Sequence, residues 1–266
     1  MLPRHLKTQS LLRIATVLLL GSYPCLCATA NEAARSNGHI WIRESVSSER
    51  RNELLRALRR ITGLADLNFE RSGSLHLGSR EALKGSTGAR ELLTEANVGE
   101  KVIVIEDASA RSDVAFCKVV PGKWLRETSD QLPAYVVLID FTDFHKITGD
   151  ERARAAFDVG WGFLHELDHI MTDAEDSEFL GVAGECEDHI NNMRRELDLP
   201  IRTNYFFVAA SFRSDPNFPA RFVSLSFEHR DRITHKTRQY RLTWDYMLVG
   251  GFDRNRQTAL VSGQSK

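Results

Sequence analysis

The sequence contains little proline and few cysteines, and it shows no internal repeats or low-complexity tracts. Only 7 of its 266 residues are Pro and 17 are Gly, which excludes collagen-like chains and Pro-rich disordered chains. Its 35 basic and 36 acidic residues give a formal net charge of -1, which argues against a dedicated nucleic-acid-binding protein or a polybasic membrane-surface protein. With 42% hydrophobic residues, the chain is long enough to bury a core without disulfide bonds.

The first thirty residues lack acidic side chains and have the layout of a secretory signal peptide. Three basic residues, the last of them Arg13, flank an apolar stretch that is too short to span a bilayer and ends in Ala-Thr-Ala at positions 28–30. Such an ending is a small-x-small cleavage signature. Cleavage after Ala30 removes three basic residues and leaves a secreted or periplasmic domain, residues 31–266, with a net charge of -4. No second long hydrophobic run follows, so we expect no membrane span after cleavage.

Cleavage also removes two of the four cysteines and leaves Cys117 and Cys186. In an oxidising compartment a pair of this kind can form a disulfide bond, and two buried thiols are the alternative. Sequence separation does not determine whether the two Cβ atoms approach within bonding distance. Both possibilities therefore stay open.

The order of patterns along residues 31–266 predicts a single α+β domain with a helical middle. We expect a small mixed or antiparallel sheet with an edge strand beside a central helix, a second helix after it, and a C-terminal β hairpin. The expected segments are strands at His39–Ile42, Lys101–Glu106, Asp113–Val120 and Ala134–Phe141, helices from Ser47 to Gly63 and at Thr87–Ala96, a helical region from Asp150 to Pro200, and hairpin arms at Arg221–His229 and Thr237–Met247.

Residues Glu151–Met171 predict one amphipathic helix that carries candidate metal ligands. Apolar or small residues recur in steps of three and four along it, which places them on one buried face. His165 and His169 lie away from that face and about one turn apart, which suits two adjacent corners of a tetrahedral zinc site. Glu166 can then reach a metal-bound water. The alternative is a solvated polar face that binds no metal.

The segment His-Glu-Leu-Asp-His at positions 165–169 resembles the HExxH helix of the zincin superfamily of zinc metallopeptidases. The resemblance extends over about Glu151–Leu197. It implies that both histidines bind Zn²⁺ and that Glu166 is the general base that activates zinc-bound water against a peptide or protein substrate. It also implies that the strand before the helix, here Ala134–Phe141, is an edge strand that pairs with the substrate backbone. Asp168 departs from the pattern, because the family prefers uncharged residues at that position.

The third ligand is expected on a second helix, Gly184–Leu197, because no third His follows at the short spacing of metzincins. The core face of this helix has Glu185 at its rim, where a ligand can meet the first helix. The arrangement is similar to that of gluzincins, in which a Glu on a later helix completes the site, so we expect His165, His169 and Glu185 to hold the zinc. A modest rotation of the helix would exchange Glu185 for one of three neighbours: Glu187, Asp188 or His189.

Two further points have alternatives. The donor that stabilises the oxyanion has four candidates downstream, where related enzymes often place one: Tyr205, His229, His235 and Tyr240. A secreted zinc-binding protein of zincin-like fold without peptidase activity would carry the same motif. Glu166-x-x-His169 also fits a di-iron carboxylate site, but such a site needs four long helices, and the abundant strand signals argue against it.

Overall fold

The computed structural model describes most of the chain after residue 37, and the described residues belong to one compact unit, Asn37–Lys266. The expected signal peptide, residues 1–30, lies outside the described residues. No described helix is long and apolar enough to cross a membrane. The described ranges are 38–79, 84–109, 111–125, 131–179, 182–205, 208–209 and 222–250.

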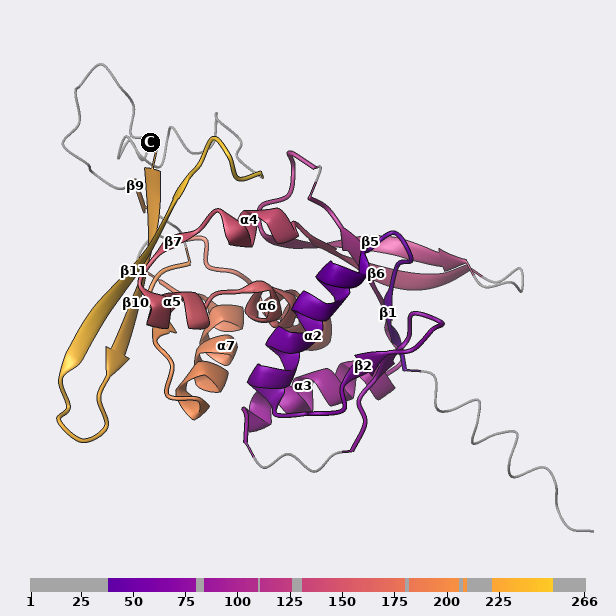
Figure 1. Cartoon of the computed structure of the whole chain (residues 1–266), viewed down its shortest axis with the longest axis horizontal. Helices are drawn as coiled ribbons and strands as arrows, with labels where there is room; N and C mark the ends of the chain where they lie inside the picture. The colour runs from indigo at the N-terminus through magenta and orange to yellow at the C-terminus, as the bar shows by residue number, and fades with distance from the viewer. Residues whose placement is uncertain are drawn as a thin grey trace, which may run out of the picture. The chain divides into compact units, whose positions relative to one another are not determined.

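Helices and sheets are both prominent in the described part of the chain, so the fold is α+β as predicted (Figure 1). The elements follow in the order β1 (Ile40–Ile42), α2 (Ser48–Thr62), β2 (Asn68–Phe69), β3 (Leu75–His76), α3 (Thr87–Val98), β4 (Val102–Asp107), β5 (Cys117–Leu125), β6 (Gln131–Ile139), α4 (Phe141–His145), β7 (Thr148–Gly149), α5 (Glu151–Ala155), α6 (Val159–Thr172), α7 (Glu185–Glu196), β8 (Ile201–Arg202), β9 (Val208–Ala209), β10 (Phe222–Arg230) and β11 (Thr237–Asp245).

The first sheet is mixed and has the strand order β1-β4-β6-β5. Strands β1, β4 and β6 are parallel, whereas β5 runs antiparallel to β6 from Cys117, opposite Ile139, to Leu125, opposite Gln131. The expectation that Ala134–Phe141 forms the edge strand is therefore wrong, because β6 lies between β4 and β5. The edge strand next to β6 is β5, which begins at Cys117 and not at Asp113.

Pro121 explains why β5 can occupy the edge. The N–H of Val119 points away from β6 and donates to Glu166 on α6, and Pro121, two residues later, has its nitrogen on the same side of the strand. A proline lacks the N–H that an interior strand would need, so it is tolerated where that side faces no partner strand. Pro121 is exposed, in agreement with this position.

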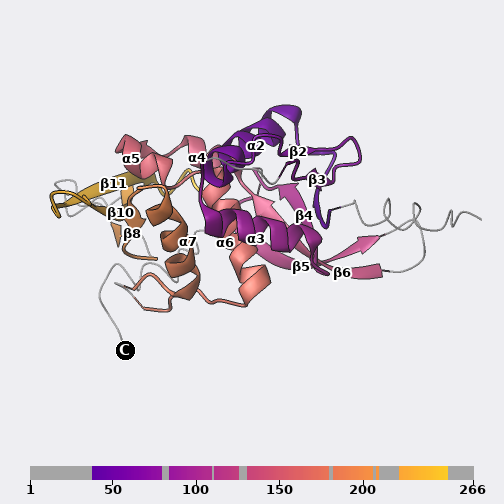
Figure 2. The same cartoon turned by 90° about the horizontal axis from the view of Figure 1, so that it is seen from below.

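Helix α6 is the central helix, since it contacts α2, α3, α7 and β5 (Figure 2). The prediction of one helix over Glu151–Met171 is wrong at its start. The Asp158 side chain accepts hydrogen bonds from the backbone N–H groups of Gly160 and Trp161, and this cap begins a new helix at Val159. The short helix α5 is thereby separated from α6.

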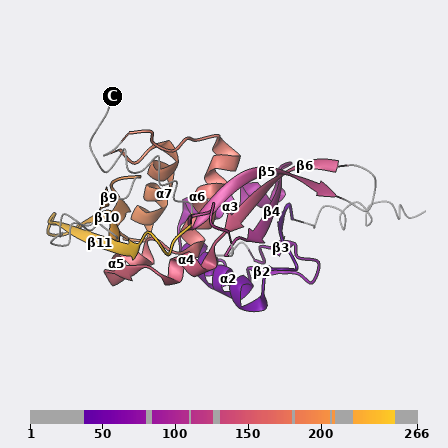
Figure 3. The same cartoon turned by 90° about the horizontal axis from the view of Figure 1, so that it is seen from above.

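The second sheet is antiparallel and contains the predicted C-terminal hairpin, β10–β11, with β8 and β9 paired to β10 and β7 paired to β11. It lies beside α5 and α7 (Figure 3). One face of the hairpin is buried in the main core, through Val223, Leu225 and Phe227 on β10 and through Leu242 and Trp244 on β11. Because these residues fall at every second position of each strand, they share the face that packs against the core.

We expect Gly160→Ala to lower the free energy of unfolding by about 1–3 kcal/mol. A Cβ at this second residue of α6 would lie 2.8 Å from the Cβ of Ala57 and 2.9 Å from the Cδ1 of Ile61, both on α2. Gly88→Ala is the matched control, since Gly88 is the second residue of α3 and its Cβ would meet only side-chain atoms, those of Glu196 and Met193 on α7 at 3.3 Å and that of Ser86 at 3.9 Å. The control should be neutral or slightly stabilising, because Ala favours helix. Urea unfolding measures both, and equal effects would contradict the close α2–α6 packing.

Candidate metal centre

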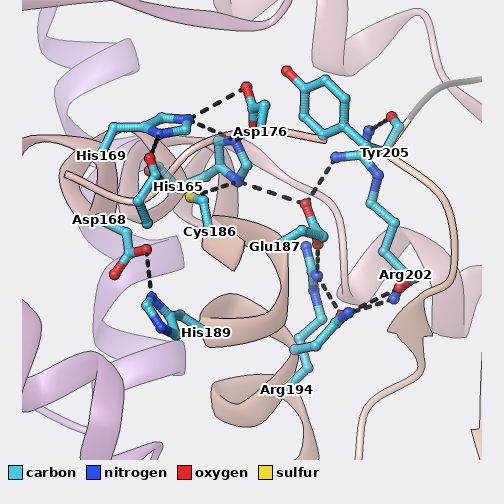
Figure 4. Close-up of polar contacts among 12 residues, drawn as sticks. His165, Asp168, His169, Asp176, Cys186, Glu187, His189, Arg194, Arg202 and Tyr205 are labelled. Carbon is cyan, nitrogen blue, oxygen red and sulfur yellow. Dashed lines mark hydrogen bonds and ion pairs between the residues drawn. The ribbon is translucent and has the colours of Figure 1, made fainter. Parts of the chain in front are cut away.

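The two histidines of α6 present the same ring atom to each other. The Nε2 atoms of His165 and His169 are 3.2 Å apart, and the ring planes are perpendicular (Figure 4). The Nδ1 atom of His169 lies 2.6 Å from the carbonyl oxygen of Ala174. A carbonyl only accepts, so Nδ1 donates, and the neutral ring keeps its lone pair on Nε2.

Asp176 brings a carboxylate to the same point from the loop after α6. The chain leaves the helix through Asp173, whose φ of 57° is left-handed, and a backbone bridge then pairs Asp176 with Gly184. Oδ1 of Asp176 lies 3.1 Å from Nε2 of His165, and Oδ2 lies 3.4 Å from Nε2 of His169. Oδ1 is buried and has no well-directed hydrogen bond among the described residues. A buried carboxylate oxygen in that state is suited to a cation.

The spacing of these donors fits a bound metal ion. In a tetrahedral site with bonds of 2.0–2.1 Å, neighbouring ligand atoms are about 3.3 Å apart. The two Nε2 atoms are 3.2 Å apart, and each lies near a different oxygen of the Asp176 carboxylate, His165 at 3.1 Å from Oδ1 and His169 at 3.4 Å from Oδ2. Three lone-pair donors that converge in this way attract any cation. In the absence of a metal, Asp176 raises the pKa of His169 to about 9, although burial of the imidazole opposes this shift. A metal ion would take the place of that proton.

Cys186 is the fourth member of the group, whose candidate ligand atoms lie within 4.8 Å of one another. Its Sγ is 3.4 Å from both Nδ1 and the backbone carbonyl oxygen of His165, on the opposite side of the ring from the Nε2 that meets His169 and Asp176. Burial raises the pKa of the Cys186 thiol, so without a metal it stays protonated. Cys117 and Cys186 are free thiols and form no disulfide bond with each other.

Glu187 supports the centre from behind His165. Its carboxylate is 1% exposed and forms ion pairs with Arg194 and, at 2.9 Å, with Arg202. Although burial alone would raise the pKa of Glu187, the two guanidinium groups lower it. Oε2 also lies 3.5 Å from Nδ1 of His165. A carboxylate at Nδ1 orients the imidazole and favours a free lone pair on Nε2.

Helix α7 does not present Glu185 to the group. Glu185 is its first residue and is exposed, as is Asp188, whereas Cys186 and Glu187 are buried against α6. His189 contacts Asp168 instead, with Nδ1 at 2.9 Å from Oδ2. This pair explains why a charged residue occupies position 168, because Asp168 is 2% exposed and joins α6 to α7. The structure thus brings together His165, His169 and Asp176, and it leaves Glu185 outside.

Glu166 lies between the imidazoles and the edge strand. It is 8% exposed, and its Oε2 accepts a hydrogen bond of 2.8 Å from the backbone N–H of Val119 on β5. Burial raises the pKa of Glu166, and the neighbouring His165 and His169 partly oppose the shift. A carboxylate whose pKa is moved toward neutrality is suited to general acid–base catalysis.

Of the four candidate oxyanion donors, Tyr205 lies at the centre. Its ring stacks on that of His165 with centroids 6.1 Å apart, and its hydroxyl group lowers the pKa of Asp176. His229 instead pairs with Asp198 at 3.0 Å, and the Tyr240 ring packs beneath Arg152. His235 is exposed in the turn of the C-terminal hairpin.

Sequence patterns missed Asp176, Arg194 and Arg202. The sequence pattern predicted a third ligand on a helix, whereas Asp176 lies in the loop between α6 and α7. The acidic residues that directly follow α6, at positions 173, 175 and 176, were an available signal. Arg194 on α7 and Arg202 on β8 gave no signal, because the sequence pattern does not distinguish a buried arginine from an exposed one.

No family model, curated protein or solved structure matches this chain. The interpretation of the centre therefore depends on the geometry of its own residues.

We expect Asp176→Asn to weaken metal binding at least tenfold, because the amide removes the anionic ligand. The matched control is Glu185→Gln, which removes a carboxylate at an exposed position and should leave the metal content and affinity unchanged. Elemental analysis and a competitive chelator titration measure both variants. If Glu185→Gln loses metal binding and Asp176→Asn keeps it, the third ligand is Glu185 on α7 and not Asp176.

Glu187→Gln is expected to lower the free energy of unfolding by about 3–5 kcal/mol, since it leaves two buried guanidinium groups without their carboxylate. The neighbouring change Asp188→Asn removes an exposed charge and should alter stability by less than about 0.5 kcal/mol. Denaturant unfolding of both variants checks the difference. A comparable small effect for both would mean that the ion pairs of Glu187 contribute little.

Proposed function

We propose that this protein is a secreted zinc-dependent metallopeptidase. Its zinc ligands are His165, His169 and Asp176, and Glu166 is the general base that promotes hydrolysis of a peptide bond. The observation that carries the proposal is the convergence of two Nε2 atoms on the two oxygens of one carboxylate, at 3.1 and 3.4 Å, directly beside a buried glutamate. Three protein ligands with an open fourth position are typical of catalytic zinc sites.

The residues around the centre divide the chemistry among them. Zinc bound there would polarise the substrate carbonyl and lower the pKa of a water molecule toward neutrality. Glu166, which Val119 orients, accepts a proton from the attacking water and later returns it to the leaving amine. Tyr205, whose ring stacks on that of His165, is the candidate donor to the carbonyl oxygen that becomes negative.

Strand β5 supports the proposal because it offers a backbone edge beside the base. Among the described residues no strand pairs with the side of β5 that faces away from β6. An extended peptide can add to such an edge through main-chain hydrogen bonds. Because Val119 on that edge already contacts Glu166, a peptide aligned along β5 would have its carbonyl groups next to the metal centre.

Cys186 favours a second candidate function, a zinc-binding protein without peptidase activity. Its Sγ belongs to the group of candidate ligands, and a fourth protein ligand would close the site as in structural zinc centres. Cys186→Ser separates the two functions. In an open catalytic centre this change leaves metal affinity nearly unchanged, whereas in a closed centre it weakens metal binding strongly.

We expect Glu166→Gln to retain one zinc per chain and to lower turnover by about 10²–10⁴-fold, since the amide cannot accept the proton. Glu175→Gln, an exposed change in the loop before Asp176, is the control and should keep wild-type turnover. Mass spectrometry of products from a peptide mixture, with metal analysis of each variant, measures the outcome. Unchanged metal content in both His165→Ala and His169→Ala would contradict the metal centre itself.

A further inference from the structure

A largely apolar cavity of about 250 Å³ adjoins the metal centre on the side of α6 that carries His165 and Glu166. Its apolar wall comes from elements far apart in the sequence and includes Phe116, Phe144, Phe157, Leu225 and Trp244. An apolar cavity of about 150 Å³ holds a benzene molecule. The cavity therefore has room for one aromatic side chain together with a small polar group, but not for several residues of a peptide.

The wall of this cavity formed by α7 and β8 carries more positive than negative charge. Arg194, Arg202 and Glu187 all line it, and their side chains are 2%, 11% and 1% exposed. Glu187 pairs with both guanidinium groups, so one carboxylate balances two cations. Glu166 also lines the cavity, but its carboxylate faces Val119 and the imidazoles of the metal centre.

The hydrogen bonds of the two arginines show where an anion can bind. Arg202 uses Nε, Nη1 and Nη2 on Asn204, Glu187 and Tyr205. Arg194 uses Nε on Ala156 and Nη1 on Glu187 and Asn191, whereas its Nη2 has no hydrogen bond within the described residues. An aromatic ring, that of Trp161, lies 5.2 Å from this guanidinium group. A buried cation with unused donors favours an additional acceptor, and a charged acceptor most of all.

The side chain of Glu187 lies between these arginines and His165 of the metal centre. Glu187 contacts His165 on one side and both guanidinium groups on the other (Figure 4). A group bound at Arg194 is thus separated from the imidazole ligands by a single side chain. In a peptide, a free α-carboxylate and the last peptide bond have a comparable separation.

We propose that the cavity binds the C-terminal residue of a peptide whose last side chain is large and apolar, with its free α-carboxylate at Arg194. This inference rests on the proposed function, because it specifies the substrate of the same centre. Hydrolysis then adds one water across the last peptide bond, breaks the C–N bond, and releases the C-terminal amino acid. The protein is on this basis a carboxypeptidase that selects a bulky apolar residue.

Binding of small probes to the metal-free mature protein tests the cavity without any turnover. Calorimetric titration with N-acetyl-L-phenylalanine and with its C-terminal amide compares a carboxylate with a neutral group on the same side chain. We expect the acid to bind about 10- to 100-fold more tightly, as a charge-assisted hydrogen bond to a buried guanidinium predicts. N-acetylglycine should bind more weakly than N-acetyl-L-phenylalanine, since it leaves the apolar wall empty.

Substitution of neighbouring arginines on α7 identifies the group responsible. Arg194→Gln leaves Glu187 paired with Arg202 alone, which removes the excess charge, so the preference for the acid should disappear. Arg195→Gln changes an exposed arginine and should preserve the preference. If Arg194→Gln fails to fold, Arg202→Gln replaces it in the test, because this variant also leaves one guanidinium group paired with the carboxylate of Glu187. Equal binding of acid and amide to the wild-type protein overturns the inference with no variant at all.

Peptide pairs distinguish failure of this inference from failure of the proposed function. The zinc-loaded protein should release the last residue from a peptide acid that ends in Phe, and it should cleave the corresponding C-terminal amide at least tenfold more slowly. If the peptide acid and its amide are cleaved at the same rate, the cavity is not a carboxylate site, but the proposed peptidase activity is supported. Selective binding of the acid probe without any peptide cleavage would instead reject the peptidase and keep the anion site.

Discussion

The buried carboxylate of Glu187 is the constraint on which the metal centre depends. It pairs with Arg194 on its own helix, joins α7 to β8 of the second sheet through Arg202, and approaches Nδ1 of His165 on α6. Charges this deeply buried are tolerated when each has a partner. The same contact turns the Nε2 lone pair of His165 toward His169 and Asp176. One interaction therefore packs α7 against α6 and orients a candidate metal ligand.

One face of helix α6 packs in the hydrophobic core, and another face carries the residues of the candidate metal centre. Leu164 and Leu167 are fully buried in the main core, while His165, Glu166 and His169 face the loop and the edge strand. The contact between Glu166 and the backbone of Val119 couples α6 to β5. An edge strand is usually a liability because its backbone groups invite pairing. Here Pro121, which has no N–H, and the buried Glu166, which accepts from Val119, limit that pairing.

Local patterns predicted those elements whose cause lies within a few residues. Ser47 caps α2, and Gly63 ends it with a φ of 76°, as the sequence indicates. The β10–β11 hairpin likewise follows from alternation and a polar turn. Strand order was not accessible in this way, because pairing partners are distant in sequence. The position of β5 beyond β6 depends on which backbone edge remains after β4 and β6 have paired.

By itself, the sequence determined the spacing of His165, Glu166 and His169, because residues four apart on a helix share a face. It also determined an α+β composition with a helical middle. Tertiary structure alone decided which carboxylate joins them. Asp176 reaches the imidazoles because the chain turns at Asp173 and pairs with Gly184, whereas packing of α7 against α6 turns Glu185 to solvent. The rotation of a helix and the path of a loop arise from contacts across the fold, which no local spacing encodes.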